Sequence, residues 1–314
     1  MHIEVRLQGK KKKYYLGHSF RVDNKVKKIR FYLGLNLSKE ELKTKRERAE
    51  KILRERIEKS KLIRDPFYTA LSPSEIGELK TLEARGEVKI LHLNEKDWLK
   101  FTKLFTYDTN AIEGSTVTVS EVGDILEKSK WSEKRTKWEI SETYGVAEAI
   151  KHIRKTKEHV SLNLIKQLHK IVFENSKPFA GNFRKMGTEV AIVNGFGNVV
   201  HRGAPSYQVT ILLNELIKWY DKNKNKYPAL VLAAVVHNHF ETVHPFRDGN
   251  GRVGRLLLNN ILLKHKLPPV NIELKNRREY YGALQEYQNN RNIRPMIELI
   301  LKEYRSLKRV LKKE

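Results

Sequence analysis

The sequence contains no cysteine, which excludes disulfide bonds, thiolate zinc sites and a cysteine nucleophile. No apolar run is long enough to cross a bilayer, and no apolar core follows the basic start MHIEVRLQGKKKK. A GxxxxGK[ST] phosphate loop is also missing, which excludes Walker-type nucleotide hydrolases. We therefore expect a soluble, cytoplasmic protein with no membrane partner.

Positive charge is abundant instead. The 314 residues carry a formal net charge of +25, and 39% of them are hydrophobic, enough for a real core. A field of this sign favours polyanionic partners, namely nucleic acid, nucleotide phosphates or acidic protein surfaces, without choosing among them.

The hydrophobic pattern predicts a mainly α-helical protein. Residues 1–37 resemble a basic β-hairpin unit, with strand-like runs YYLGHSFRV and KKIRFYLGL separated by DNK. SKEE, from Ser38, has the form of a capping box and opens a charged connecting helix over 38–65. A helical region is predicted over 66–130 and the helical core over 131–314. Within that core, TEVAIVNGFGNVVHRG predicts a β-hairpin turning at NGFGN, 194–198.

Cations and aromatic residues alternate along the N-terminal strands. This combination suits contact with nucleic acid through phosphates and stacking. A solvated basic hairpin that packs its aromatic residues on the next helix explains it better, and a protein-docking unit is a further alternative. The residues concerned are Lys10 to Lys13, Tyr14, Tyr15, Arg21, Lys27, Lys28, Arg30, Phe31 and Tyr32.

The string HPFRDGNGRVGR at 244–255 concentrates unusual chemistry. Pro245 predicts that the preceding helix ends at His244, and a new amphipathic helix begins within GNGRVGRLLLNNILL. Glycines allow a ligand close to the backbone, and free N–H groups at a helix start suit an anion. Arginines three residues apart can serve the same anion, and an adjacent carboxylate suits magnesium. The pattern predicts a di- or triphosphate site beside a general base.

The same string resembles the Fic family signature HxFx(D/E)GNGRxxR at every fixed position. GNFR at 181–184 and the preceding AAVVHNHFETVHPF are similar to further family segments, so the resemblance extends over roughly 68–300. It implies a Fic-type helical bundle with a β-hairpin flap. It also implies an enzyme that transfers AMP from ATP, with Mg²⁺, to a serine, threonine or tyrosine hydroxyl of a target protein.

The resemblance also implies roles for single residues. His244 would be the general base, Phe246 the apolar anchor of the loop and Asp248 the magnesium ligand. The α- and β-phosphates would lie against the backbone and the Asn250 side chain, and Arg255 nearest the γ-phosphate. The residues implied to bind phosphate are Gly249, Asn250, Gly251, Arg252 and Arg255. The flap would align a target segment by strand addition. It includes Val190, Ile192, Val193, Val199 and Val200. Tyr280 and Tyr281 would line the adenine side.

TNAIEGST at 109–116 resembles the inhibitory motif [S/T]xxxE[G/N] of self-restrained family members, through Thr109, Glu113 and Gly114. A carboxylate from Glu113 could pair bidentately with Arg255 and displace the γ-phosphate. Glu113 could equally end a helix, with Gly114 following. In some relatives the same glutamate aligns a water that removes AMP, so de-AMPylation is an alternative activity.

Two further possibilities follow from the sequence. His237 and His239 with His244 suggest a zinc or iron site, but residues two apart face different sides of a helix, so packed histidines are expected instead. Restrained relatives often dimerise, so a homodimer is expected beside the unidentified target protein.

Overall fold

The computed structural model describes residues 1–9, 11–22, 25–64, 71–84, 93–193 and 199–311. It divides into two compact units, Met1–Asp65 and Pro66–Glu314. The predicted turn NGFGN, the predicted turn DNK in part, Lys10, and the side chains of Arg21 and Lys27 lie outside the described residues.

The N-terminal unit is an antiparallel sheet of order β1-β2-β3 with one helix. Its elements are β1 (His2–Gln8), β2 (Lys11–Val22), β3 (Lys25–Leu35) and α1 (Lys39–Arg64). The prediction of a two-stranded hairpin was incomplete, because β1 adds a third strand that pairs His2 with Gly17 and Gln8 with Lys11. Ile3, Val5 and Leu7 alternate with polar residues in β1, but the run is short and half charged or polar, so its local pattern is a weak signal for a strand.

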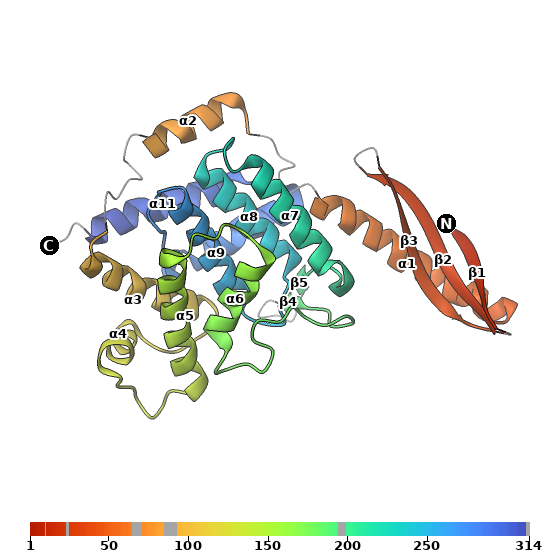
Figure 1. Cartoon of the computed structure of the whole chain (residues 1–314), viewed down its shortest axis with the longest axis horizontal. Helices are drawn as coiled ribbons and strands as arrows, with labels where there is room; N and C mark the ends of the chain where they lie inside the picture. The colour runs from red at the N-terminus through yellow and green to blue at the C-terminus, as the bar shows by residue number, and fades with distance from the viewer. Residues whose placement is uncertain (10, 23–24, 65–70, 85–92, 194–198, 312–314) are drawn as a thin grey trace. The chain divides into compact units, whose positions relative to one another are not determined.

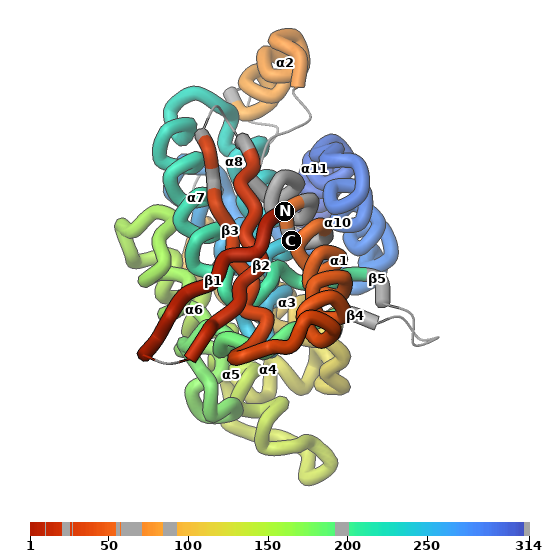
Figure 2. Tube along the Cα trace, turned by 90° about the vertical axis from the view of Figure 1, so that its right-hand side faces the viewer, coloured from red at the N-terminus to blue at the C-terminus, as the bar shows by residue number. Residues whose placement is uncertain are grey.

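Helix α1 lies along one face of this sheet (Figure 2). The predicted capping box is present: the Ser38 hydroxyl accepts from the Glu41 N–H at 3.2 Å, and Glu41 accepts from the Ser38 N–H at 2.9 Å. Ala49 and Leu53 of the helix bury against Leu16 and Leu33 of the sheet. A thin apolar stripe on α1 is therefore enough to close a small core.

The second unit is mainly helical (Figure 1). Its helices are α2 (Pro73–Ala84), α3 (Glu95–Ile112), α4 (Val119–Lys128), α5 (Lys137–Lys155), α6 (Leu162–Phe173), α7 (Val209–Asn223), α8 (Ala229–Val243), α9 (Asn250–Lys264), α10 (Arg277–Asn290) and α11 (Arg294–Leu311). Strands β4 (Ala191–Val193) and β5 (Val199–Arg202) pair antiparallel, as the predicted flap requires. The short turns η1 (Ser206–Gln208) and η2 (Leu274–Asn276) precede α7 and α10.

Helix α8 forms the centre of this unit. Every residue from Ala229 to Val243 is buried, because the helix is apolar on nearly all sides and is packed by α7, α9, α10 and α11. Helix α9 runs against α8 and also contacts α3, α5 and α6. Helices distant in the sequence therefore pack around the junction between α8 and α9. In the ranges that the structure describes, no helix is long and apolar enough to span a membrane.

Candidate active site

The loop between α8 and α9 has a tightly determined backbone. His244 follows α8 in the left-handed region (φ 52°, ψ 63°), which is strained for a residue with a side chain. Gly249 precedes α9 with φ 82°, and a Cβ there would lie 2.3 Å from the Phe173 ring. Position 249 therefore requires glycine for both its dihedral angle and its lack of a side chain.

Two interactions fix the inside of this loop. Phe246 is fully buried and stacks on His169, with ring centroids 3.9 Å apart. The Asn250 amide donates to the Phe246 carbonyl at 3.0 Å and accepts from the Phe246 N–H at 2.8 Å. The side chain of Asn250 therefore holds the loop in shape here, and the backbone N–H groups at the start of α9 remain the part of this segment suited to an anion.

A buried arginine outside the 244–255 string clamps the same loop. The Arg184 Nε donates to the His244 carbonyl at 2.8 Å, and its Nη2 donates to the carbonyls of Ala204 and Val243. The Arg184 backbone N–H donates to the Pro245 carbonyl at 3.0 Å. This arginine, from the GNFR segment, ties the strained backbone of His244 to the chain that leads out of β5.

The His244 imidazole is suited to accept a proton. Burial, and next the neighbouring His201, lower its pKa to about 4, so it is neutral at pH 7. Its Nδ1 lies 3.3 Å from the Glu241 carbonyl oxygen, which can only accept. This contact favours the tautomer with hydrogen on Nδ1, which leaves the Nε2 lone pair available as a base.

Arg255 is the most enclosed charge of the site, with 1% of its surface exposed. Its Nη2 donates to Glu113 Oε1 at 2.7 Å and to the Thr109 carbonyl at 3.0 Å, and its Nε donates to the Thr109 hydroxyl at 2.7 Å. Its Nη1 lies 3.2 Å from the Tyr280 hydroxyl, which also contacts His237 at 3.0 Å. The predicted Glu113–Arg255 pair is present, but through one hydrogen bond rather than bidentately, because Thr109 of the same motif accepts from Nε and Nη2.

Glu113 also lies over the first turn of α9. A Cβ on Gly251 would be 2.1 Å from its Oε1, so the carboxylate rests where only a glycine leaves room. Glu113 ends α3 as its C-cap, and Gly114 follows with φ 99°, so the structural role expected for this pair holds together with the ion pair. The Glu113 carboxylate therefore occupies the start of α9, the position suited to a phosphate.

Glu241, at the end of α8, is a second carboxylate near Arg255. Burial, and next the negative charge of Glu113, raise its pKa to about 8, with Arg255 opposing the shift. Its Oε2 lies 3.8 Å from His244 Nδ1, and its Oε1 is buried with no hydrogen-bond partner. At pH 7 this side chain is therefore largely protonated.

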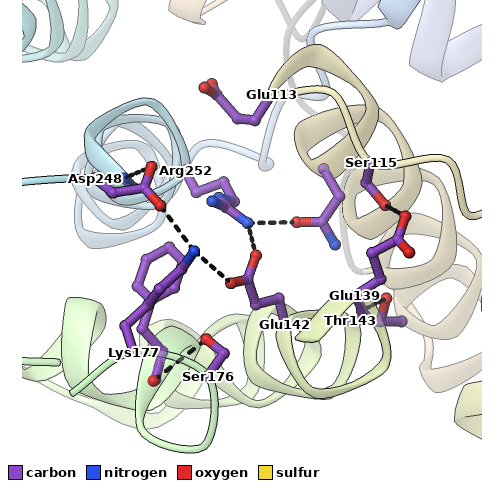
Figure 3. Close-up of polar contacts among 12 residues, drawn as sticks. Glu113, Ser115, Glu139, Glu142, Thr143, Ser176, Lys177, Asp248 and Arg252 are labelled. Atoms are coloured by element: carbon purple, nitrogen blue, oxygen red, sulfur yellow. Dashed lines mark hydrogen bonds and ion pairs between the residues drawn. The ribbon is translucent and has the colours of Figure 1, made fainter. Parts of the chain in front are cut away.

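A chain of alternating charges crosses the other side of the site (Figure 3). Asp248 Oδ2 lies 3.1 Å from Lys177 Nζ, which is 3.6 Å from Glu142 Oε1, and Glu142 Oε2 accepts from Arg252 Nη1. Arg252 also lies over the Phe173 ring at 4.5 Å. Burial raises the pKa of Asp248, but Lys177 and Arg252 outweigh this effect and hold it below its usual value. Both predicted charged residues here, Asp248 and Arg252, have partners from the chain.

The remaining predicted residues are distributed as follows. Tyr280 is buried beside Arg255, while Tyr281 is 36% exposed and donates to the Ile112 carbonyl at 3.4 Å, so Tyr281 has the surface that a ligand could reach. The Val190 carbonyl accepts from Gly203 at 3.1 Å beside the flap. The other four flap residues belong to β4 and β5. His201 of β5 lies next to His244, with ring centroids 5.8 Å apart.

The histidines of α8 do not assemble with carboxylates. Among the described residues, no group of three or more His, Asp or Glu side chains lies close enough to hold a metal ion. His237 contacts Tyr280, and burial lowers the pKa of both His237 and His239 to about 3.

Four residues of this site were not singled out from the sequence. Glu241 lies inside a helix that reads as a core element, and Arg184 was noted only as part of GNFR. Glu142 and Lys177 lie on and beyond helices far upstream of the 244–255 string, with no local pattern that marks them. What these four residues share is a charged side chain that is buried or paired inside the folded unit, which the local sequence does not reveal.

The sequence is similar to that of a known protein family. Residues 159–262 match the family model described as Fic/DOC family. The protein adenylyltransferase fic-1 of Caenorhabditis briggsae is 32% identical over 205 residues, covering 63% of this chain and 39% of that protein. The protein adenylyltransferase Fic of Nematostella vectensis is 31% identical over 200 residues, covering 62% of this chain and 45% of that protein.

The solved structures give the same result. Fic-1 (residues 134–508) from Caenorhabditis elegans superposes with a TM-score of 0.63 at 27% identity, covering 76% of this chain and 72% of that one. A Fic domain-containing signalling protein from Bacteroides thetaiotaomicron shares the fold, with a TM-score of 0.65 at 22% identity over 74% of this chain and 95% of that one. Residues 159–262 therefore match the Fic/DOC family, within a unit that shares the fold of these structures. The chain spans about two fifths of the length of the curated relatives it matches.

The raised pKa of Glu241 has a measurable consequence. The unfolded chain releases this proton near pH 4.5, whereas the folded chain holds it to about pH 8, so the stability that Glu241 contributes falls as pH rises across that window. Glu241→Gln has no proton to release. We therefore expect its melting temperature to equal that of wild type at pH 4.5 and to exceed it by several degrees at pH 8.5. Thermal melts at both pH values test this.

Glu148→Gln, which changes an exposed carboxylate on α5 paired with Lys151, is the matched control and should show a constant difference from wild type. The buried histidines lose their contribution below pH 6.5, and they do so equally in both proteins. A Glu241→Gln difference that does not grow with pH would contradict the prediction.

Proposed function

We propose that this chain is a protein adenylyltransferase that attaches AMP from ATP to a hydroxyl of a target protein and is restrained by Glu113. The observation that carries the proposal is the meeting of three parts: a neutral imidazole at His244, a helix start suited to phosphate at α9, and a carboxylate from Glu113 lying over that start. The names of the relatives support the same reaction.

The residues of the site divide the work of the reaction. His244 Nε2 would take the proton from the target hydroxyl as its oxygen bonds to the α-phosphorus, and the bond to the β-phosphate would break to release pyrophosphate. The start of α9, with Arg252 and Arg255, would bind the phosphates and balance their charge. The buried setting strengthens these contacts, because little water screens them.

Asp248 would hold magnesium, which when bound with ATP neutralises phosphate charge. The carboxylate fits this role because one oxygen, Oδ1, is held by the Gly249 N–H at 2.7 Å while Oδ2 already faces a cation, Lys177. Since a magnesium ion usually takes one or two carboxylates together with phosphates and water, one protein ligand suffices.

The hairpin of β4 and β5 would present its edge to a segment of the target. His201 of β5 stands beside His244, so a segment paired with this hairpin would bring its hydroxyl to the base. The identity of the target, the expected homodimer and the cytoplasmic location, where ATP is abundant, remain predictions.

Restraint by Glu113 is tested by its removal. We expect Glu113→Gly to free Arg255 and the start of α9, so that the protein incubated with magnesium and ATP modifies itself at a surface hydroxyl. Intact-protein mass spectrometry should show a gain of one AMP that is weak or missing in wild type. Glu113→Gly/His244→Ala should show no gain, because the base is missing.

Loss of AMP from a modified partner, seen with wild type and abolished in Glu113→Gly, would support the alternative of de-AMPylation. No mass gain in any variant together with no such release would overturn the proposed activity.

Lys177 generates a separate prediction about magnesium. A divalent cation at Asp248 must compete with the Lys177 ammonium 3.1 Å away. We expect Lys177→Met to bind Mn²⁺ several-fold more tightly than wild type without nucleotide, measured by electron paramagnetic resonance. Lys170→Met, which removes a cation paired with Glu174 on the exposed side of α6, should bind like wild type. Weaker binding in Lys177→Met would mean that the lysine orders Asp248 for the ion instead.

A further inference from the structure

The N-terminal sheet has a second face that α1 does not cover. The strand register places Arg6 beside Lys13 and Tyr15 beside Tyr32, while Gly17 and Ser19 stand beside Arg30 and Lys28. All of these alternate with Leu16, Ile29, Phe31 and Leu33, which belong to the core under α1. Among the described residues of this unit, cations and tyrosines therefore dominate one open face, here called the open sheet face: Arg6, Lys13, Tyr15, Lys28, Arg30 and Tyr32.

The cations of the open sheet face are held together by one carboxylate. The Glu4 carboxylate accepts from Lys28 at 2.8 Å and from Arg30 at 2.7 Å, and it lies 3.9 Å from Arg6. Gly17 leaves room for this cluster, because a Cβ there would lie 2.7 Å from Glu4 Oε1. One carboxylate thus orders three cations, and the face keeps an excess of positive charge.

The whole unit has the charge that a polyanion would require. Residues 1–65 contain 21 Lys and Arg against nine Asp and Glu, a net of +12, which is about half of the +25 of the chain in about a fifth of its length. The predicted active site uses none of these residues. Such a concentration raises the local concentration of polyanions and the rate of their association.

The geometry favours a duplex over a single strand. Three strands at a spacing of about 4.8 Å cover about 10 Å, which fits the major groove of B-DNA, about 12 Å wide. A single strand would need free aromatic faces for stacking. Here Arg6 covers the Tyr15 ring at 5.5 Å, and Tyr32 packs against Tyr15 with centroids 5.3 Å apart. The tyrosines support the cations more than they offer a stacking surface.

We propose that the open sheet face binds double-stranded DNA, with Arg6, Lys28 and Arg30 on the phosphates and the three strands against the major groove. This binding is independent of the transfer reaction proposed above. Glu4 holds the cations until phosphates replace it as their partner.

The proposal is tested on the full chain with a fluorescently labelled random-sequence DNA duplex, by anisotropy over a series of salt concentrations. Arg6→Ala/Lys28→Ala/Arg30→Ala should bind at least about tenfold more weakly and lower the salt slope by about 3, one for each lost phosphate contact. The matched control is Lys43→Ala/Arg48→Ala/Lys51→Ala, which removes three exposed cations of α1 in the same unit and should change both quantities little.

Glu4→Gln supplies a test that damage to the fold cannot imitate. Removing the competing carboxylate should tighten DNA binding and leave the salt slope equal or steeper; weaker binding would count against the proposal. Equal weakening by the two triple variants, or no binding by wild type, would overturn the assignment to this face. Tighter binding of single-stranded DNA, of RNA or of an anionic protein than of the duplex would overturn the choice of ligand.

Discussion

A buried guanidinium must be fully paired, and the pairing of Arg255 determines how the helices of the site are placed. Its partners come from α3 through Thr109, from the end of α3 through Glu113, and from α10 through Tyr280. Removing the negative partner of such a group leaves an uncompensated charge inside the protein, which a second anion can neutralise. Arg255 therefore acts as a fixed point at which α3, α9 and α10 meet, and a phosphate group would enter a site whose cation is already in position.

The two arginines of α9 differ in how easily their partners could leave. Arg252 and Glu142 are both almost enclosed, with 7% and 11% of their side chains exposed, whereas Glu113 is 28% exposed at a helix end. Rotation of Glu113 toward water would leave Arg255 with the Thr109 carbonyl, the Thr109 hydroxyl and Tyr280. The Arg255 guanidinium would then stay in position while a phosphate replaced the Glu113 carboxylate as its negative partner.

The features of the site that the sequence predicts are those whose residues lie close together along the chain. The loop from His244 to Arg255 is one contiguous string, so its helix end, its glycines and its cations were predictable from local rules. The helical regions over 66–130 and 131–314 were also predictable from periodicity. The partners of the loop could not be found in this way: Arg184 is 60 residues from His244 and Glu142 is 110 from Arg252. Tertiary packing alone brings them together.

The strain of His244 explains why so much of the unit converges on one short loop. A left-handed residue with a side chain is unfavourable in isolation and persists only where its surroundings determine it. Arg184 fixes its carbonyl, the Phe240 carbonyl accepts its N–H at 2.9 Å, and the buried stack of Phe246 on His169 prevents the following residues from relaxing. The same constraints hold the imidazole with Nδ1 toward the Glu241 carbonyl, which leaves Nε2 available. The left-handed backbone of His244 is therefore unfavourable in itself, but it also sets the tautomer of the His244 imidazole.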